Sequence, residues 1–136
     1  MINSRLSVAI HILSLLATQP QQRLTSEFIA GSVQTNPVVV RRISGLLRKE
    51  GLISTHAGIS GAILTKEPRY ITLLDIYNAV FSEDNLFSIH DNPNPDCPVG
   101  KEIQQTLNHS FARAENAMKN ELAAQTLEDT MEHLFA

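Results

Sequence analysis

The chain has 136 residues and a formal net charge of −3, and 43% of its residues are hydrophobic. This length suffices for one domain with a modest core plus one additional long helix. No apolar run is long enough to cross a membrane, so we expect a soluble protein without a membrane partner. The single cysteine, Cys97, excludes an internal disulfide framework and is typical of a protein in the reducing cytoplasm.

The first predicted element is a helix over residues 6–17, which we interpret as a core helix because one basic residue precedes it and no signal-peptide cleavage site follows. Its main apolar stripe repeats at helical spacing and consists of Leu6, Ala9, Ile10, Leu13, Leu16 and Ala17. Val8, Ile12 and Leu15 form a second stripe on the same helix. A surface helix of a small monomer needs only one apolar stripe, so we expect the second stripe to contact a partner subunit.

The next two elements are short helices separated by a tight turn. The first is capped by Thr25 or Ser26 and runs to Val33, and three polar residues, 34–36, follow it. The second covers about residues 36–50, with Asn36 as N-cap, Pro37 at the first helical position and a glycine as its stop. Two helices joined in this way predict a helix-turn-helix.

The helix over 36–50 has two contrasting faces. Its apolar side carries Val39, Val40, Ile43, Leu46 and Leu47. Its opposite side carries Val38, Arg41, Gly45 and Arg48, with Arg42 and Lys49 on the flanks. A helix that is apolar behind and basic in front fits the major groove of DNA, although a solvated amphipathic helix is the plainer alternative.

The charge distribution favours the DNA interpretation. Residues 1–70 carry eight Lys and Arg against three Glu, whereas residues 71–136 carry three against eleven Asp and Glu. The first half therefore suits a polyanionic partner. We expect Arg41 to read a base edge, Val38 to lie near a thymine methyl group, and Arg48 and Lys49 to contact phosphates. Further phosphate contacts are expected from the cap residues Thr25, Ser26, Thr35 and Asn36.

A β-hairpin is predicted after this helix. The β-prone runs 52–55 and 62–65 are joined by the glycine-containing link 56–61. In the order helix, helix, helix, hairpin, this hairpin is expected to be the wing of a winged helix rather than an ordinary surface hairpin. The predicted fold is therefore mainly α, a winged helix-turn-helix with a small β-hairpin wing.

The C-terminal half predicts one structural helix, a loop and a long dimerisation helix. Thr72 and Asp75 form a capping box for a helix over 72–81, and residues 82–96 lack periodicity. A helix from about 98 to 124 is about 40 Å long and carries an apolar stripe, which consists of Val99, Ile103, Leu107, Phe111, Ala114, Met118 and Leu122. Thr126 caps a short terminal helix. The predicted division is 1–81 as the winged-helix domain, 82–96 as a loop and candidate sensor region, and 97–136 as the dimerisation part.

The sequence gives weaker indications of a metal site, a redox site or a catalytic site than of DNA binding. A metal site at His90, Asp91, Asp96, Cys97 and Glu102 is less favoured than a solvated loop, and no histidine pair has zinc-motif spacing. Cys97 precedes a helix start, which can lower its pKa and suit a redox sensor, but a structural thiol is favoured over that role. No set of catalytic residues can be placed in one pocket, so we do not expect an enzyme.

These motifs together resemble the Rrf2 family of bacterial winged-helix transcription regulators. The resemblance rests on RLSVAIHILSLLA at 5–17, TSEFIAGSVQTNPVVVRRISGLLRKEGLIST at 25–55, GISGA at 58–62, ITLLDIYNAV at 71–80 and CPVG at 97–100. It implies a homodimer whose long helices cross, with Val8, Ile12, Leu15, Ile103, Leu107, Phe111 and Met118 as the contact residues we expect.

Two departures from the family pattern matter. Family members with an iron–sulfur cluster have three cysteines before the long helix, whereas this chain has only Cys97, so we expect no cofactor and no metal. Ala57 stands where the wing often has an arginine, which leaves the backbone of Gly58, Ser60 and Gly61 for phosphate contacts.

The leading hypothesis is a homodimeric repressor that binds double-stranded DNA, with an unidentified small-molecule or redox effector. The alternatives are a winged-helix protein-interaction module without DNA binding, and a thiol or metal sensor that acts through Cys97. Salt-dependent binding to DNA separates the first two, and its response to oxidation or metal tests the third.

Overall fold

Six α-helices and a two-stranded antiparallel hairpin make up the described part of the chain, residues 4–81 and 86–136 of a computed structural model. The elements in chain order are α1 (Arg5–Thr18), α2 (Ser26–Val33), α3 (Pro37–Lys49), β1 (Ile53–His56), β2 (Ile59–Leu64), the 3-10 helix η1 (Pro68–Tyr70), α4 (Leu73–Phe81), α5 (Pro98–Ala123) and α6 (Leu127–Leu134). This order confirms the predicted fold class. Within the described residues, no helix is both long and apolar enough to cross a membrane.

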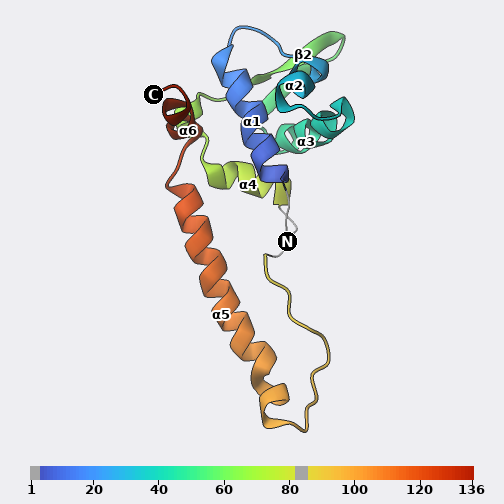
Figure 1. Cartoon of the computed structure of the whole chain (residues 1–136), viewed down its shortest axis with the longest axis vertical. Helices are drawn as coiled ribbons and strands as arrows, with labels where there is room; N and C mark the ends of the chain where they lie inside the picture. The colour runs from blue at the N-terminus through green and yellow to red at the C-terminus, as the bar shows by residue number, and fades with distance from the viewer. Residues whose placement is uncertain (1–3, 82–85) are drawn as a thin grey trace.

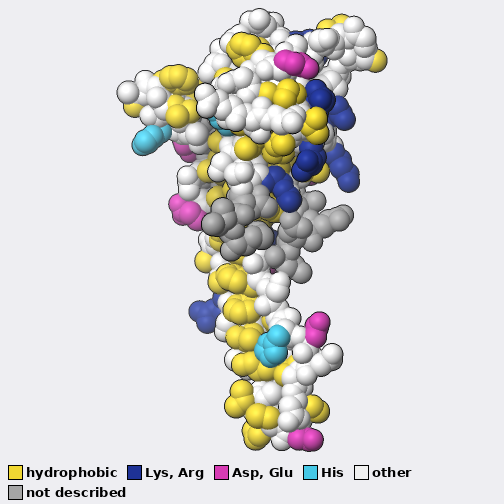
Figure 2. Space-filling model, turned by 45° about the vertical axis from the view of Figure 1, so that its right-hand side comes forward, with side chains coloured by type: hydrophobic (Ala, Val, Ile, Leu, Met, Phe, Trp, Pro, Cys, Tyr) yellow, Lys and Arg dark blue, Asp and Glu magenta, His cyan; other side chains and the backbone are white. Residues whose placement is uncertain are grey.

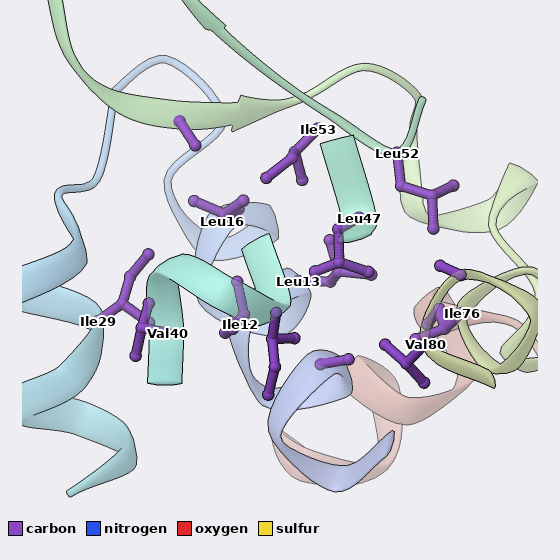
Figure 3. Close-up of a cluster of buried hydrophobic side chains, with 14 of the residues drawn as sticks. Ile12, Leu13, Leu16, Ile29, Val40, Leu47, Leu52, Ile53, Ile76 and Val80 are labelled. Atoms are coloured by element: carbon purple, nitrogen blue, oxygen red, sulfur yellow. The ribbon is translucent and has the colours of Figure 1, made fainter. Parts of the chain in front are cut away.

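The winged-helix body is built around α1. This helix contacts α2, α3, α4, α6 and β2, and the hydrophobic core lies where these elements meet (Figures 1 and 3). The largest fully buried side chains come from all parts of the body and include Ile12, Leu13, Leu16, Ile29, Val40, Leu47, Leu52, Ile71, Ile76 and Leu127. Burying such side chains contributes about 1.5–3 kcal/mol each, so this cluster is the main stabilising feature of the body.

The prediction that Ile12 contacts a second subunit is wrong. Ile12 is 0% exposed within a single chain, because α1 is surrounded by its own neighbours and therefore buries more than one stripe. Val8 and Leu15 are half-buried and pack against the same core. For these two residues, contact with a partner remains a prediction.

The terminal helix α6 packs on the winged-helix body. Leu127 N donates a hydrogen bond to Ile71 O at 2.8 Å, and Leu73 N donates one to Gln125 O at 2.9 Å, so the segments that precede α4 and α6 pair with each other. Leu127 is 0% exposed and belongs to the main core. The terminal helix, which the predicted division groups with the long helix, thus contacts the body, and the division of the chain into three parts remains a prediction.

Helix α5 projects away from the body, as Figure 1 shows. Its C-terminal end contacts α4, and the segment 86–97 runs beside its N-terminal half. Phe87 stacks on Phe111 with ring centroids 4.8 Å apart, and Gln104 Nε2 donates a hydrogen bond to His90 O at 3.1 Å. Residues 82–85 of the predicted loop lie outside the described residues.

Candidate nucleic-acid interface

Helix α3 is defined at both ends by local hydrogen bonds. Asn36 Oδ1 accepts a hydrogen bond from Val38 N at 2.8 Å, and Pro37 occupies the first turn, which confirms the predicted start. At the other end Gly51 has φ +84°, and Leu52 N donates to Leu47 O at 3.0 Å. This is a Schellman cap, in which glycine adopts the left-handed conformation without a Cβ penalty. The helix therefore has a fixed length and direction.

The two faces of α3 lie as the sequence predicted. Val40, Ile43 and Leu47 are buried against the body. Val38 is 53% exposed, and four basic side chains of the same helix are also exposed: Arg41, Arg42, Arg48 and Lys49. Figure 2 shows Lys and Arg side chains gathered on one side of the body, while hydrophobic side chains run along the projecting part of the molecule.

Gly45 leaves open space in the middle of α3. A Cβ at this position would have nothing within 4 Å, so the packing of the described residues does not require a glycine here. Glycine inside a helix costs about 1 kcal/mol relative to alanine. A residue that lowers the stability of the helix and is not needed for packing is consistent with close approach by another molecule.

Helix α2 and the turn place a set of polar groups beside α3. Thr25 Oγ1 accepts a hydrogen bond from Phe28 N at 3.2 Å and caps α2, as one of the two predicted caps. Gln34 has φ 60°, and Thr35 N donates to Ala30 O at 3.1 Å, which closes the turn to α3. Ala30 of α2 is small and buried, at 5% exposed, and α2 contacts α3, so the two helices pack closely.

The wing has a shorter turn than predicted. Strand β1 extends to His56 and β2 begins at Ile59, so the turn is Ala57 and Gly58 rather than the six residues 56–61. Gly58 has φ +80°, which permits the tight turn. The register shifts between Thr55 and His56, because Thr55 pairs with Ala62 but His56 pairs with Ile59. The two intervening residues, 60 and 61, therefore form a bulge on β2.

Gly61 in this bulge is required by the fold. It has φ +97°, and a Cβ there would lie 2.8 Å from Arg23 Cβ. The close approach arises because Leu24 pairs with Ala62, with Leu24 N to Ala62 O at 3.1 Å and Ala62 N to Leu24 O at 3.0 Å. The segment before α2 is thereby fixed against the wing. Contact of Gly61 with a phosphate remains a prediction.

A hollow of about 440 Å³ lies between α2, α3 and the wing. Six of the predicted DNA-binding residues line it: Thr25, Ser26, Arg41, Arg48, Ser60 and Gly61. Arg48 Nη1 lies 3.5 Å from Thr55 Oγ1 on β1, so this side chain bridges α3 and the wing. The hollow thus brings together polar groups from three elements.

The remaining predicted contact residues lie outside this hollow. Arg42 faces the other flank of α3, where it lines a second hollow with Arg5 and Val8. The rest do not line the first hollow: Thr35, Asn36, Val38, Gly45, Lys49 and Gly58. Their contact with DNA stays a prediction.

Sequence reasoning missed Glu27, Ser44 and Thr55, which also line the first hollow. Ser44 follows Arg41 by three residues, so helical spacing alone could have placed it on the same side of α3. Thr55 lies at the end of a predicted strand, and its proximity to α3 depends on the wing geometry. Glu27 Oε1 lies 3.6 Å from Arg41 Nη1, a contact between residues of two different helices.

Cys97 is exposed immediately before α5. Hydrogen bonding by the backbone amides of Gly100 and Val99 lowers the pKa of the Cys97 thiol, and burial opposes this only weakly because the group is exposed. A lowered thiol pKa increases the thiolate fraction, which is the reactive form. A more reactive thiol is what the candidate sensor role of Cys97 requires, and that role stays a prediction.

Helix α5 has no buried residue along its 26 residues. Ile103, Leu107, Phe111 and Met118 are half-buried, and Val99 is 67% exposed. An apolar stripe of this length that its own chain covers only in part is typical of an interaction surface.

A winged helix-turn-helix whose second helix, here α3, presents a basic face to solvent is typical of DNA-binding transcriptional regulators. The chain belongs to the Rrf2 family, whose model is described as an iron-dependent transcriptional regulator and matches residues 2–133. This confirms the predicted resemblance. The family members compared below are regulators, in agreement with the expectation that the chain is not an enzyme.

Relatives and solved structures extend this likeness to nearly the whole chain. The chain is 53% identical over 135 residues to the Bacillus subtilis (strain 168) protein "Putative HTH-type transcriptional regulator YwnA", with 99% of this chain and 100% of that protein covered. A crystal structure described as that of "a putative DNA binding protein" shares 48% identity at a TM-score of 0.78, over 94% of this chain and 99% of the other. The structure of CymR (YrzC), the global cysteine regulator of B. subtilis, shares the fold at 22% identity and a TM-score of 0.69. The match covers 97% of this chain and 96% of the CymR chain.

The residues of this chain do not fit the iron implied by the family description. The sequence has one cysteine, whereas an iron–sulfur cluster is held by about four protein ligands, mostly thiolates. Among the described residues, no three His, Cys, Asp or Glu side chains gather where they could hold a metal ion. The predicted weak candidates around Cys97 are therefore not assembled into a site. We assign no role to iron in DNA binding.

Proposed function

We propose that this chain is a homodimeric repressor that acts in the cytoplasm by placing α3 of each subunit in the major groove of its operator. One observation carries the proposal: α3 buries its apolar side and exposes a basic side with an open glycine at its centre. The positive charge of residues 1–70 supports the same partner, because neutralising phosphates supplies most of the non-specific affinity for DNA.

The contacts divide into base readout and phosphate binding. Arg41, one turn into α3, is suited to a guanine edge, and Val38 is suited to a thymine methyl group. Arg48 and Lys49 lie two turns later, where a helix that enters with its N-terminus first meets the backbone. Arg42 lies on the flank and suits either role.

Further phosphate contacts are proposed from the elements around α3. The starts of α2 and α3 offer hydroxyl, amide and backbone N–H groups to phosphate oxygens. These groups belong to Thr25, Ser26, Thr35 and Asn36, and the wing adds Gly58, Ser60 and Gly61.

The proposed dimer forms through α5. Helix α5 projects beyond the body (Figure 1), and no residue of it is buried by its own chain, so much of its apolar stripe is available to a second copy. Two bodies held in this way would contact two half-sites separated by whole turns of DNA.

Selection of bound fragments from random DNA tests the proposal. We expect one enriched inverted repeat and an affinity that falls steeply with salt concentration. Transcription from a promoter that contains the selected site should decrease when the protein is added. Binding without sequence preference, or no binding, would contradict the proposed function, and increased transcription would contradict the sign of regulation.

A second proposal concerns Cys97, because the pKa of its exposed thiol is lowered by the start of α5. If this thiol is the sensor, mild peroxide should weaken operator binding by the wild type but not by Cys97→Ser. Equal binding by the oxidised and reduced wild type would exclude the sensor role and leave the repressor function unaffected.

A further inference from the structure

Glu27 occupies an unusual position for a carboxylate in a DNA-binding surface. Among the described residues that line the hollow between α2, α3 and the wing, it is the one acid, beside Arg41 and Arg48. Its side chain is 72% exposed, and its Oε1 atom lies 3.6 Å from Arg41 Nη1. A carboxylate here would repel the phosphates of any bound DNA, so its presence lowers the general affinity of this surface.

The two helices that carry this ion pair have defined positions in the fold. Glu27 lies in the first turn of α2, where the helix dipole favours an acid and where the Thr25 cap holds the helix start. Arg41 lies in the rigid, doubly capped α3. The two side chains therefore meet from two helices whose relative position is set by the buried core.

The ion pair contributes little to folding, because exposed pairs are worth about 0–1 kcal/mol. The ion pair matters instead for the direction in which the Arg41 guanidinium points. A guanidinium has five N–H donors, and two of them suffice for a bidentate contact with guanine O6 and N7. Glu27 can accept one donor from Nη1 and leave the other edge of the guanidinium for the base.

We propose that Glu27 is a specificity-determining positioning residue, which holds Arg41 toward the base edge and disfavours its rotation onto a phosphate. This inference rests on the proposed reading of DNA by α3. Glu27 acts through Arg41, and it lowers binding to all DNA in exchange for greater selectivity.

Glu27→Gln tests this role, because the change removes the charge and keeps the size of the side chain. We expect Glu27→Gln to bind random-sequence DNA more tightly than the wild type. We also expect its discrimination between the operator and a site that lacks the guanine contacted by Arg41 to fall by about fivefold. The matched control is Glu67→Gln, which breaks a similar exposed pair with Arg69, at 3.1 Å, away from α3. The control should leave discrimination unchanged, and circular dichroism should show both variants folded.

The double variant Glu27→Gln/Arg41→Ala separates positioning from direct readout. If Glu27 acts through Arg41, adding Glu27→Gln to Arg41→Ala should not change discrimination further. Persistence of the fivefold effect without Arg41 would mean that Glu27 reads a base itself, which overturns the inference. Loss of selectivity in Arg41→Ala with none in Glu27→Gln also overturns it, while leaving the proposed function in place. Unselective binding by the wild type would instead overturn the proposed function and this inference together.

Discussion

Arg41 and Lys49 occupy different parts of α3, so alanine should affect DNA binding in different ways at the two positions. Arg41→Ala should lose about 1–3 kcal/mol on the preferred site and relax its specificity, because a bidentate base contact is removed. Lys49→Ala should weaken binding to all DNA similarly and lower the salt slope by about one. Fluorescence anisotropy over a salt series measures both effects. Unchanged affinity and selectivity in Arg41→Ala would show that α3 is not the reading helix.

Replacing Gly45 should stabilise the fold, and a large replacement should weaken DNA binding. Gly45→Ala should raise the free energy of unfolding by about 0.5–1 kcal/mol, because a Cβ there meets nothing within 4 Å. A larger side chain, as in Gly45→Leu, should keep the fold but weaken operator binding, because it fills the space that the DNA backbone or base edge would occupy.

Gly31 in α2 provides the matched control, since a Cβ at that position also meets nothing within 4 Å. Gly31→Leu should leave operator affinity nearly unchanged. Thermal unfolding and anisotropy on these three variants separate the effect on stability from the effect on DNA binding. Equal weakening of DNA binding at both glycines would contradict a specific close approach at Gly45.

At the scale of the element, α6 links the end of the chain to the winged-helix body. Leu127→Ala should cost about 2–5 kcal/mol of unfolding free energy, since Leu127 is fully buried among residues of the body. Leu134→Ala is the matched control in the same helix, because Leu134 is 59% exposed and should change stability little. Urea denaturation compares the two variants. A small effect of Leu127→Ala would mean that the body is stable without α6.

The ends of the helices could be predicted from the sequence because each depends on a few neighbouring residues. Thr72 and Asp75 exchange hydrogen bonds at 2.9 and 3.0 Å, and Thr126 and Asp129 do so at 2.9 and 3.1 Å. Such reciprocal caps span only four residues. For the same reason the contrasting faces of α3 followed from helical spacing alone.

The features that the sequence did not reveal depend on contacts between distant segments. Ile12 is buried because five other elements surround α1, and the pattern of α1 alone cannot show how many neighbours it has. Gly61 is needed because Arg23, far away in the sequence, approaches it closely. Glu27 was overlooked as part of the interface for the same reason, since its pairing with Arg41 exists only once α2 and α3 cross.

At the scale of the whole molecule, the chain should bind DNA without iron. Protein purified without oxygen is expected to be colourless and to contain no stoichiometric iron or labile sulfide, because one cysteine per chain cannot hold a cluster in the usual way. Elemental analysis and visible absorption measure this directly. A brown preparation whose operator binding is lost on chelation would contradict the prediction.

The arrangement of α5 predicts that dimerisation and folding of the body can be separated. Ile103 and Leu107 lie in the N-terminal half of α5 and do not belong to the core cluster, so a substitution at either position should not disturb the core of the body. Ile103→Asp or Leu107→Asp would place an unpaired carboxylate in the proposed subunit interface, which costs several kcal/mol. We expect these variants to be monomers by light scattering, with the helical signal of the body retained and operator affinity strongly reduced, because each body would then bind only one half-site.

Gln105→Asp is the control for these variants, since it introduces the same side chain at an exposed position on the opposite side of α5. It should remain dimeric and bind the operator like the wild type, so any loss that is specific to Ile103 and Leu107 reports the interface and not helix propensity. A wild type that is a stable folded monomer at micromolar concentration would contradict the dimer. In that case the apolar stripe of α5 would have to be covered by a different partner, and two half-sites would no longer be expected in the selected DNA.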